Sequence, residues 1–286
     1  MDEATMLAAS FTWGNTPMPQ SRLLGVLGIL LSTASVSFAA EPIDLLFKAK
    51  LDGTDQRYVV ILPDDFDAEK PHSVLIALHG HGSDRWQFVK DRRDECRAAR
   101  DAATKHKLIF VSPDYRAKTS WMGPAAEADV VQILEELKAK YRVSKVIVSG
   151  GSMGGTAALT FAALHPELVD GVVSMNGTAN LVEYDQFQDA IAASFGGTRA
   201  EKPDEYRKRS AELYLDKLTM PIACTTGGKD RAVPPQSVLR LIDGLKAKER
   251  PVKLIHRPDG GHSTNYADAT EAYEYVVTAI AKDANP

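Results

Sequence analysis

A serine set among glycines suits nucleophilic chemistry. The run Val148-Ser-Gly-Gly-Ser-Met-Gly-Gly155 contains Gly150-Gly-Ser152-Met-Gly154, which follows a predicted strand and precedes a predicted helix of small residues. A sharp turn between strand and helix would expose the Ser152 hydroxyl, and the glycines leave room for the strained backbone. The alternative is a glycine-rich turn that only packs or holds a phosphate, but the lysine of a phosphate-binding loop is absent. The pattern therefore indicates that Ser152 is a nucleophile.

A serine hydroxyl is a weak nucleophile until a neighbouring base accepts its proton. The chain has seven histidines, and His262 stands in Asp259-Gly-Gly-His-Ser263, between a late predicted strand and the last predicted helix. A loop in this place can carry an imidazole over the carboxyl ends of parallel strands. We therefore predict that His262 is the base and that the other six histidines have structural or surface roles.

The base needs an acid that holds its tautomer. Asp230 lies in Gly227-Gly-Lys-Asp-Arg-Ala-Val-Pro-Pro235, directly after a predicted strand. The alternative acid, Asp259, lies three residues before His262 and precedes two glycines, a context typical of a turn. We therefore predict Asp230 as the acid.

A serine nucleophile also needs N–H donors for the oxyanion that forms during acyl transfer. The backbone N–H of Met153, directly after the nucleophile, is one candidate donor. The N–H of His81, in Leu78-His-Gly-His-Gly-Ser83, is the second, because the flanking glycines let the backbone approach a substrate. His79 and His81 could instead bind a metal, but no further His, Asp or Glu cluster completes such a site. We expect neither a metal nor a cofactor.

Short apolar runs alternate with amphipathic stretches from about residue 42 onward. Such runs, rich in β-branched residues and bounded by Gly, Pro or Asp, favour strands over helices. The predicted strands are 58–62, 74–78, 108–111, 146–148, 171–175, 222–225 and 252–255. The predicted helices include 156–163, a segment with apolar residues from Val130 to Tyr141, one from Val238 to Leu245, and a last one at 267–282. This alternation predicts an α/β fold with a mostly parallel central sheet and helices on both faces.

Residues 176–217 are the least regular stretch, and we predict that they form a cap or a wall of the pocket. Tyr115 and Trp121 follow a strand whose carboxyl end should face the site, so they are candidates for an aromatic wall. Asn176 follows the strand 171–175 and is a third candidate for substrate binding. Glu127 and Asp129, near the start of a helix, are expected at the surface.

The first 39 residues have the order of a secretory signal peptide. Arg22 precedes the apolar run 23–31, small residues follow, and Ser37-Phe-Ala39 fits a cleavage site. Met18 is the better start, because residues 1–17 contain two acidic residues. We expect cleavage after Ala39, a single domain over 40–286, no propeller domain before the first strand, and a secreted or periplasmic protein. The alternative is an uncleaved membrane anchor over the 18 charge-free residues 23–40.

The composition excludes several classes of protein. Hydrophobic residues make up 44% and charged residues 25% of the chain, as in ordinary globular proteins, and the formal net charge is −4. This charge gives no indication of a nucleic-acid partner. After removal of the leader we expect no stable membrane span. The two cysteines, Cys96 and Cys224, are too few for a disulfide framework, so we expect two free thiols.

Four motifs together resemble those of the α/β-hydrolase superfamily. They are HGHG at 79–82, GGSMGG at 150–155, GKDRAVPP at 228–235 and GGHS at 260–263. The order Ser152, Asp230, His262 is also that of α/β-hydrolases. More narrowly, the chain is similar to the secreted esterase D, feruloyl esterase and acetyl xylan esterase group and to prolyl-oligopeptidase-type catalytic domains. This resemblance implies the α/β-hydrolase fold, with Ser152 as nucleophile, His262 as base and Asp230 as acid.

Three functions are consistent with these residues. The first is a serine hydrolase of carboxylic esters, with a small-molecule substrate or polysaccharide-linked acetyl or feruloyl esters. The second is a small-peptide hydrolase of the prolyl-oligopeptidase type. The third is a binding protein that keeps the fold without its chemistry, because one fold can carry many functions. The complete set of nucleophile, base and acid favours the first two.

Overall fold

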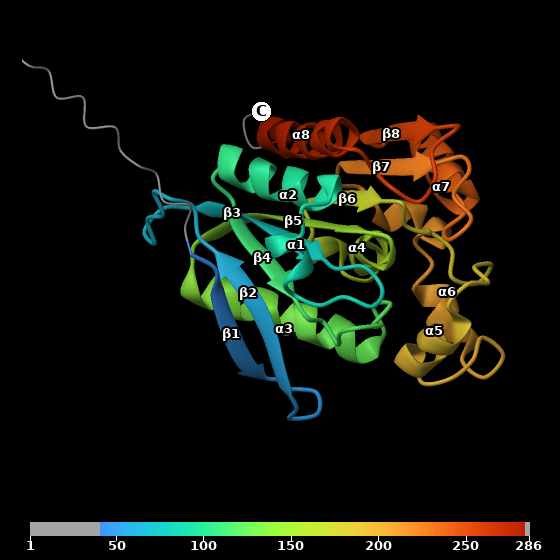
Figure 1. Cartoon of the computed structure of the whole chain (residues 1–286), viewed down its shortest axis with the longest axis horizontal. Coiled ribbons are helices and arrows are strands. Elements are labelled where there is room, and N and C mark those ends of the chain that lie inside the picture. Colours follow the sequence, from blue (N-terminus) through green and yellow to red (C-terminus); the bar gives the residue numbers. More distant parts are fainter. Residues whose placement is uncertain (1–40, 284–286) are drawn as a thin grey trace, which may run out of the picture. The chain divides into compact units, whose positions relative to one another are not determined.

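The computed structural model describes residues 41–283, and the predicted leader lies outside this range. The described residues form an eight-stranded sheet in the order β1-β2-β4-β3-β5-β6-β7-β8 (Figure 1). β1 and β2 are antiparallel to their neighbours, and the strands from β4 to β8 run parallel. The strands are β1 (Ile43–Lys48), β2 (Asp55–Ile61), β3 (His72–Leu78), β4 (Ile109–Pro113), β5 (Val143–Gly151), β6 (Gly171–Met175), β7 (Ile222–Gly227) and β8 (Val252–Arg257). The predicted mostly parallel sheet is confirmed.

Helices cover both faces of this sheet, as predicted. One apolar core lies between the sheet and α3, α4 and α7, and a second core lies between the opposite face and α1, α2 and α8 (Figure 1). The helices are α1 (Gln87–Lys90), α2 (Asp94–Lys105), α3 (Pro124–Lys140), α4 (Met153–Leu164), α5 (Gln188–Phe195), α6 (Pro203–Lys208), α7 (Gln236–Ala247) and α8 (Tyr266–Asp283). No helix of the described range is both long and apolar enough to cross a membrane.

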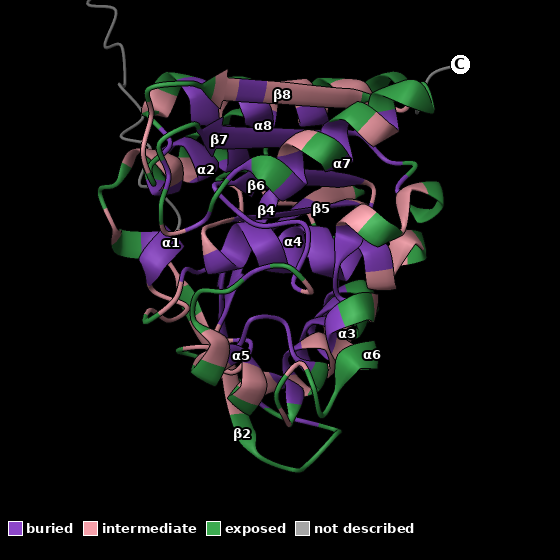
Figure 2. Ribbon diagram, turned by 90° about the vertical axis from the view of Figure 1, so that its right-hand side faces the viewer, coloured by how far each residue is buried: buried purple, intermediate pink, exposed green. Residues whose placement is uncertain are grey.

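Burial follows the two layers of helices. Figure 2 shows the central strands and α4 almost wholly buried, whereas α7 and β8 carry exposed or half-buried residues on their outer sides. α4 packs closely because its first turn consists of small residues. A Cβ atom at Gly154 would lie 1.9 Å from the carbonyl oxygen of Leu78, so only glycine fits there. This close approach brings the start of α4 to the carboxyl end of β3.

β1 is a strand that the sequence pattern did not predict. It pairs only with β2 at the edge of the sheet, and Ile43 and Leu46 remain exposed. Its residues therefore do not form the continuous apolar run by which the buried strands are recognised.

The strand order creates a crevice at the carboxyl edge of the sheet. β3 lies between β4 and β5, so the chain leaves β3 for one side of the sheet and later returns on the other side. Loops that depart in opposite directions leave space between them, and ligands bind at such switch points in α/β sheets. The loops after β3, β5, β7 and β8 bring the predicted triad and oxyanion residues to this edge.

The segment predicted as a cap, 176–217, contains α5, α6 and two short 3₁₀ turns at Ala211–Leu213 and Leu215–Lys217. A buried arginine, Arg209, ties it to the rest of the molecule. Its guanidinium donates to the carbonyl of Met122 at 2.8 Å and to the carboxylate of Glu127 at 2.6 Å. The second oxygen of Glu127 bonds to His165 at 2.9 Å.

Glu127 and Asp129 were expected at the surface, and the structure corrects this. Glu127 is only partly exposed and joins Arg209 to His165. Asp129 is 1% exposed and forms an ion pair with Arg116 at 2.6 Å. The ion-pair partners of both carboxylates lie outside α3, so the residue pattern of this helix alone does not reveal them.

The His165 network should make stability depend on pH. The hydrogen bond to Glu127 raises the pKa of His165 above the unperturbed 6.5, so the folded protein holds this proton more tightly than the unfolded chain. The resulting stabilisation is fully present below about pH 6.5 and is lost as the pH rises through the raised pKa. We expect His165→Gln to lower the free energy of unfolding by about 0.5–1 kcal/mol more at pH 6 than at pH 9. Urea unfolding at both pH values measures this, and an equal loss would contradict it.

Both cysteines lie in the described part of the chain, Cys96 in α2 and Cys224 in β7, and neither forms a disulfide. The expectation of free thiols is confirmed. Burial raises the pKa of each thiol to about 12, which keeps both protonated at neutral pH.

Candidate active site

Ser152 occupies a strained turn between β5 and α4. Its backbone has φ +57° and ψ −120°, a conformation that residues with a side chain rarely adopt. The turn is held by the Ser152 N–H, which donates to the carbonyl of Met175 at 2.8 Å. A Cβ at Gly150 would lie 2.5 Å from the backbone of Gly154, so these glycines are required for the turn to close. The turn points the Ser152 hydroxyl into a cavity.

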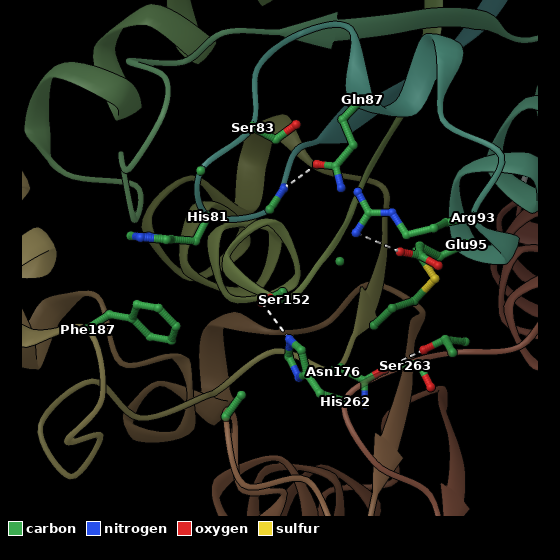
Figure 3. A pocket seen from close by; sticks show the side chains of 16 residues that line it. His81, Ser83, Gln87, Arg93, Glu95, Ser152, Asn176, Phe187, His262 and Ser263 are labelled. Carbon is green, nitrogen blue, oxygen red and sulfur yellow. Dashed lines mark hydrogen bonds and ion pairs between the residues drawn. The ribbon is translucent and has the colours of Figure 1, made fainter.

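A chain of two hydrogen bonds joins the three predicted residues. The Ser152 hydroxyl lies 2.9 Å from Nε2 of His262, and Nδ1 of His262 lies 2.6 Å from Oδ2 of Asp230 (Figure 3 shows the first contact). The Asp230 side chain is 1% exposed, whereas that of His262 is 32% exposed. An ionised carboxylate only accepts, so Nδ1 carries the proton and Nε2 is left to accept from serine. The geometry is therefore that of a nucleophile, a base and an orienting acid.

Asp230 is held in place by its own loop. Its Oδ1 accepts hydrogen bonds from the backbone N–H groups of Ala232 and Val233, both at 2.9 Å. These two bonds leave Oδ2 for His262. The alternative acid, Asp259, lies at the surface, where it forms an ion pair with Lys229 at 2.6 Å.

Asn176 lines the cavity, but its amide is engaged with the protein. The Thr264 hydroxyl donates to its Oδ1 at 2.5 Å, and its Nδ2 lies 3.5 Å from both Oδ2 of Asp230 and the carbonyl of Gly261. Asn176 therefore braces the Asp230 carboxylate and the loop that carries His262.

The two predicted oxyanion donors come from two different segments next to the nucleophile. Met153 is the first residue of α4, so its N–H has no partner within the helix. His81 lies in the loop after β3 and lines the cavity. Within residues 41–283 neither N–H donates a hydrogen bond. Two free N–H groups beside a serine hydroxyl are what an oxyanion needs.

The cavity above Ser152 has a volume of about 570 Å³. Figure 3 shows His81 and Phe187 on one side of Ser152, and Gln87, Arg93 and Glu95 on another. The first side is aromatic and the second is polar and charged. A substrate bound at Ser152 would therefore meet two walls of different chemistry.

The structure corrects the prediction that Tyr115 and Trp121 form the aromatic wall. Their side chains are 1% and 0% exposed and do not line the cavity. The Tyr115 hydroxyl donates to the carbonyl of His79 at 2.5 Å, and Nε1 of Trp121 donates to Nδ1 of His81 at 3.2 Å. Both side chains therefore support the loop after β3 from behind. Burial lowers the pKa of His81, which is consistent with a neutral ring that accepts from Trp121.

Phe187 supplies the aromatic wall instead. It comes from the segment 176–217, is 41% exposed, and places its ring 4.6 Å from that of His81 and 5.5 Å from that of Trp121. Nothing in the local sequence distinguishes this phenylalanine. Its place depends on contacts with residues that lie far away in the chain.

His79 is the first of the two histidines that the sequence offers as possible metal ligands. The ring of His79 is buried, and its two nitrogens lie 2.9 Å and 3.0 Å from the carbonyl oxygens of Gly80 and Asp114. Across residues 41–283, no group of three or more His, Cys, Asp or Glu side chains is arranged to hold a metal ion.

Comparisons with known proteins agree with this geometry. Residues 116–279 match the profile of the prolyl oligopeptidase family. The mouse acylamino-acid-releasing enzyme is 26% identical over 161 residues, which cover 53% of this chain and only 22% of that enzyme. The chain thus spans about a fifth of the length of this relative.

Solved structures share the fold at lower identity. A puromycin hydrolase superposes with a TM-score of 0.68 at 18% identity, over 85% of this chain and 39% of that chain. A ferulic acid esterase superposes with a TM-score of 0.65 at 18% identity, over 84% of this chain and 98% of that chain. The sheet order, the helices on both faces and these superpositions establish the α/β-hydrolase fold. Since the family profile matches residues 116–279 of the 286, the chain belongs to the prolyl oligopeptidase family.

Proposed function

We propose that this protein hydrolyses carboxylic esters by two-step acyl transfer. The observation that carries the proposal is the hydrogen-bonded chain from Ser152 through His262 to Asp230, placed at a cavity beside two free N–H groups. Each part of the acyl-transfer mechanism has a residue at hydrogen-bonding distance from the next.

In the first step, the Ser152 oxygen bonds to the ester carbonyl carbon while Nε2 of His262 takes the hydroxyl proton. The N–H groups of Met153 and His81 stabilise the resulting oxyanion, and Asp230 stabilises the imidazolium. The carbon–oxygen bond of the ester then breaks, and the alcohol leaves with the proton from His262.

In the second step, water attacks the acyl-enzyme and His262 accepts its proton. The bond between the acyl carbon and Ser152 breaks, and His262 returns the proton to the serine oxygen. The products are a carboxylic acid and an alcohol, and the enzyme is regenerated. No other reactant is required.

Two observations support esters as the substrates. A ferulic acid esterase shares the fold over 98% of its length. The aromatic wall formed by Phe187 and His81 suits an aryl acyl group such as feruloyl. We therefore propose polysaccharide-linked feruloyl or acetyl esters as natural substrates. We also propose that the leader is cleaved after Ala39 and that the mature protein is exported.

A small-peptide hydrolase is the second candidate. The family profile and the similarity to the acylamino-acid-releasing enzyme favour it. A panel of 4-nitrophenyl esters from acetate to octanoate, beside 4-nitroanilides of short peptides, separates the two functions. Turnover of the esters with little or no turnover of the anilides supports the proposal, and the reverse result supports the peptidase.

The aromatic wall leads to a prediction about Phe187. Replacing it by alanine removes a ring that contacts His81 at a tilted angle and is open to the cavity. Aromatic contacts contribute about 0.5–1.5 kcal/mol beyond their buried area, so kcat/KM for feruloyl esters should fall about tenfold relative to acetyl esters. Steady-state rates on the 4-nitrophenyl esters of both acids measure the ratio.

Leu213→Ala is the matched control, since Leu213 is also 41% exposed in the segment 176–217 but does not line the cavity. This variant should keep the wild-type ratio. A ratio unchanged in Phe187→Ala would show that the aryl group binds elsewhere.

A further inference from the structure

The polar wall of the cavity carries no part of the proposed acyl transfer. It consists of Gln87, Arg93 and Glu95, which come from α1, the loop after it and the first turn of α2. Figure 3 shows all three side chains directed toward the cavity. A substrate held at Ser152 therefore has a second set of charged and polar groups available.

Gln87 presents a fixed donor. Its Oε1 accepts a hydrogen bond from the N–H of Gly80 at 2.7 Å, which orients the amide. The Nε2 group lies on the other side of the amide, and within residues 41–283 it donates a hydrogen bond to no protein atom. Only a ligand or water in the cavity can accept from it.

Arg93 and Glu95 form a pair that is close but not hydrogen-bonded. Nη1 of Arg93 lies 3.7 Å from Oε1 of Glu95, while Nε and Nη2 of Arg93 lie 2.9 Å and 2.8 Å from the Asp91 carboxylate. Asp91 thus orients the guanidinium and leaves Nη1 for the cavity. Across the described residues the Glu95 carboxylate accepts no hydrogen bond, although its side chain is only 17% exposed.

This wall lies close to the nucleophile. The Cγ of Glu95 would lie 3.7 Å from a Cβ at Gly151, the residue before Ser152. A Cβ at Gly80 would lie 3.5 Å from the carbonyl of the same Gly151, and Gln87 packs against Gly80. The polar wall therefore borders the place where the alcohol or acyl part of a bound ester must lie.

These three side chains offer two donors and one acceptor side by side, and this pattern suits one type of polar ligand better than the others. A carboxylate could accept from Gln87 and Arg93, but it would be repelled by Glu95, which already lies beside Arg93. A trans peptide group presents its N–H and C=O on opposite edges, so it cannot contact neighbouring donor and acceptor groups together. In the gauche arrangement, the two hydroxyls of a vicinal diol lie close together, and each can both donate and accept. One hydroxyl can accept from Arg93 or Gln87 while the other donates to Glu95.

We propose that Gln87, Arg93 and Glu95 form a subsite for a vicinal diol in the alcohol part of the ester, as in a partly acylated sugar or another polyol. This inference rests on the proposed ester hydrolysis and adds the residues that recognise the alcohol. Arg93 and Glu95 determine specificity in it, and Gln87 serves both this subsite and the loop after β3.

A matched pair of substrates tests the proposal on the full chain. The esters 2,3-dihydroxypropyl butanoate and 3-hydroxypropyl butanoate share one acyl group, and only the first has a vicinal diol. Because hydrogen bonds to charged groups are strong, we expect kcat/KM to be about tenfold higher for the diol ester. Arg93→Met and Glu95→Gln should each reduce this preference to about twofold or less. General damage near Ser152 would lower both rates together and leave their ratio unchanged.

Arg92→Met is the matched control, because it removes the same charge from the neighbouring exposed position, which does not line the cavity. It should keep the wild-type preference. Equal rates on the two esters in the wild type, or a preference that survives both Arg93→Met and Glu95→Gln, would overturn the diol subsite and leave ester hydrolysis standing. A protein that hydrolyses neither these esters nor the 4-nitrophenyl esters would overturn the proposed function itself.

Discussion

Replacing Ser152 by alanine is expected to lower kcat for ester hydrolysis by about 10⁴- to 10⁶-fold. The change removes the oxygen that bonds to the acyl carbon, and it leaves the cavity and the N–H groups of His81 and Met153 in place. Each tenfold loss corresponds to about 1.4 kcal/mol, so the loss in transition-state stabilisation is about 5–8 kcal/mol. Rates of 4-nitrophenyl ester hydrolysis by purified wild type and variant measure it.

A fluorophosphonate probe gives a second readout of the same prediction. It should label the wild type and fail to label Ser152→Ala. Ser144→Ala is a suitable control, because Ser144 is an exposed residue of β5 whose hydroxyl bonds to that of Ser73, away from the cavity. This control should keep both activity and labelling. Substantial activity or labelling in Ser152→Ala would assign the nucleophile to another residue.

Asp230→Asn is expected to lower kcat by about 10⁴-fold. The two backbone N–H groups of Ala232 and Val233 require an oxygen at the position of Oδ1, so the amide nitrogen of the variant would face His262. Nδ1 would then have to accept a hydrogen bond from the amide instead of donating one. Nε2 would carry the hydrogen, and it could no longer take the proton of Ser152.

The structure provides a control for this prediction in Asp259→Asn. Asp259 lies at the surface, where it pairs with Lys229, and its replacement should change kcat by less than about twofold. The kcat of both variants is measured on the same ester. A loss of only a few-fold in Asp230→Asn would mean that the tautomer of His262 is held by another group, and Asn176 would be the first residue to examine.

Local patterns predicted the buried elements well. The run 171–175 coincides with β6, and the last amphipathic stretch, 267–282, lies within α8. Buried parallel strands are continuous apolar runs, and surface helices show a period of 3.6 residues. Both patterns can therefore be recognised without knowing which other elements they pack against. β1 was missed because an edge strand with exposed side chains has neither pattern.

The aromatic residues show where local reasoning fails. Tyr115 and Trp121 do follow the expected strand, but their side chains turn inward to hold the loop after β3. Phe187, which lines the cavity, lies in the segment with the least regular pattern. The position of a strand end can be predicted from sequence, whereas the direction of a side chain beyond it depends on packing.

Local sequence patterns were enough to predict the parallel architecture and the three residues Ser152, Asp230 and His262, because each stands in a glycine-bearing turn that follows a strand. Parallel strands bring such turns to one edge of the sheet, so their meeting could be expected before any contact was known. Long-range packing determines which other side chains share the cavity. Arg93 and Glu95 reach it from the start of α2 and Phe187 from the distant segment 176–217, and their roles follow from contacts that no local spacing encodes.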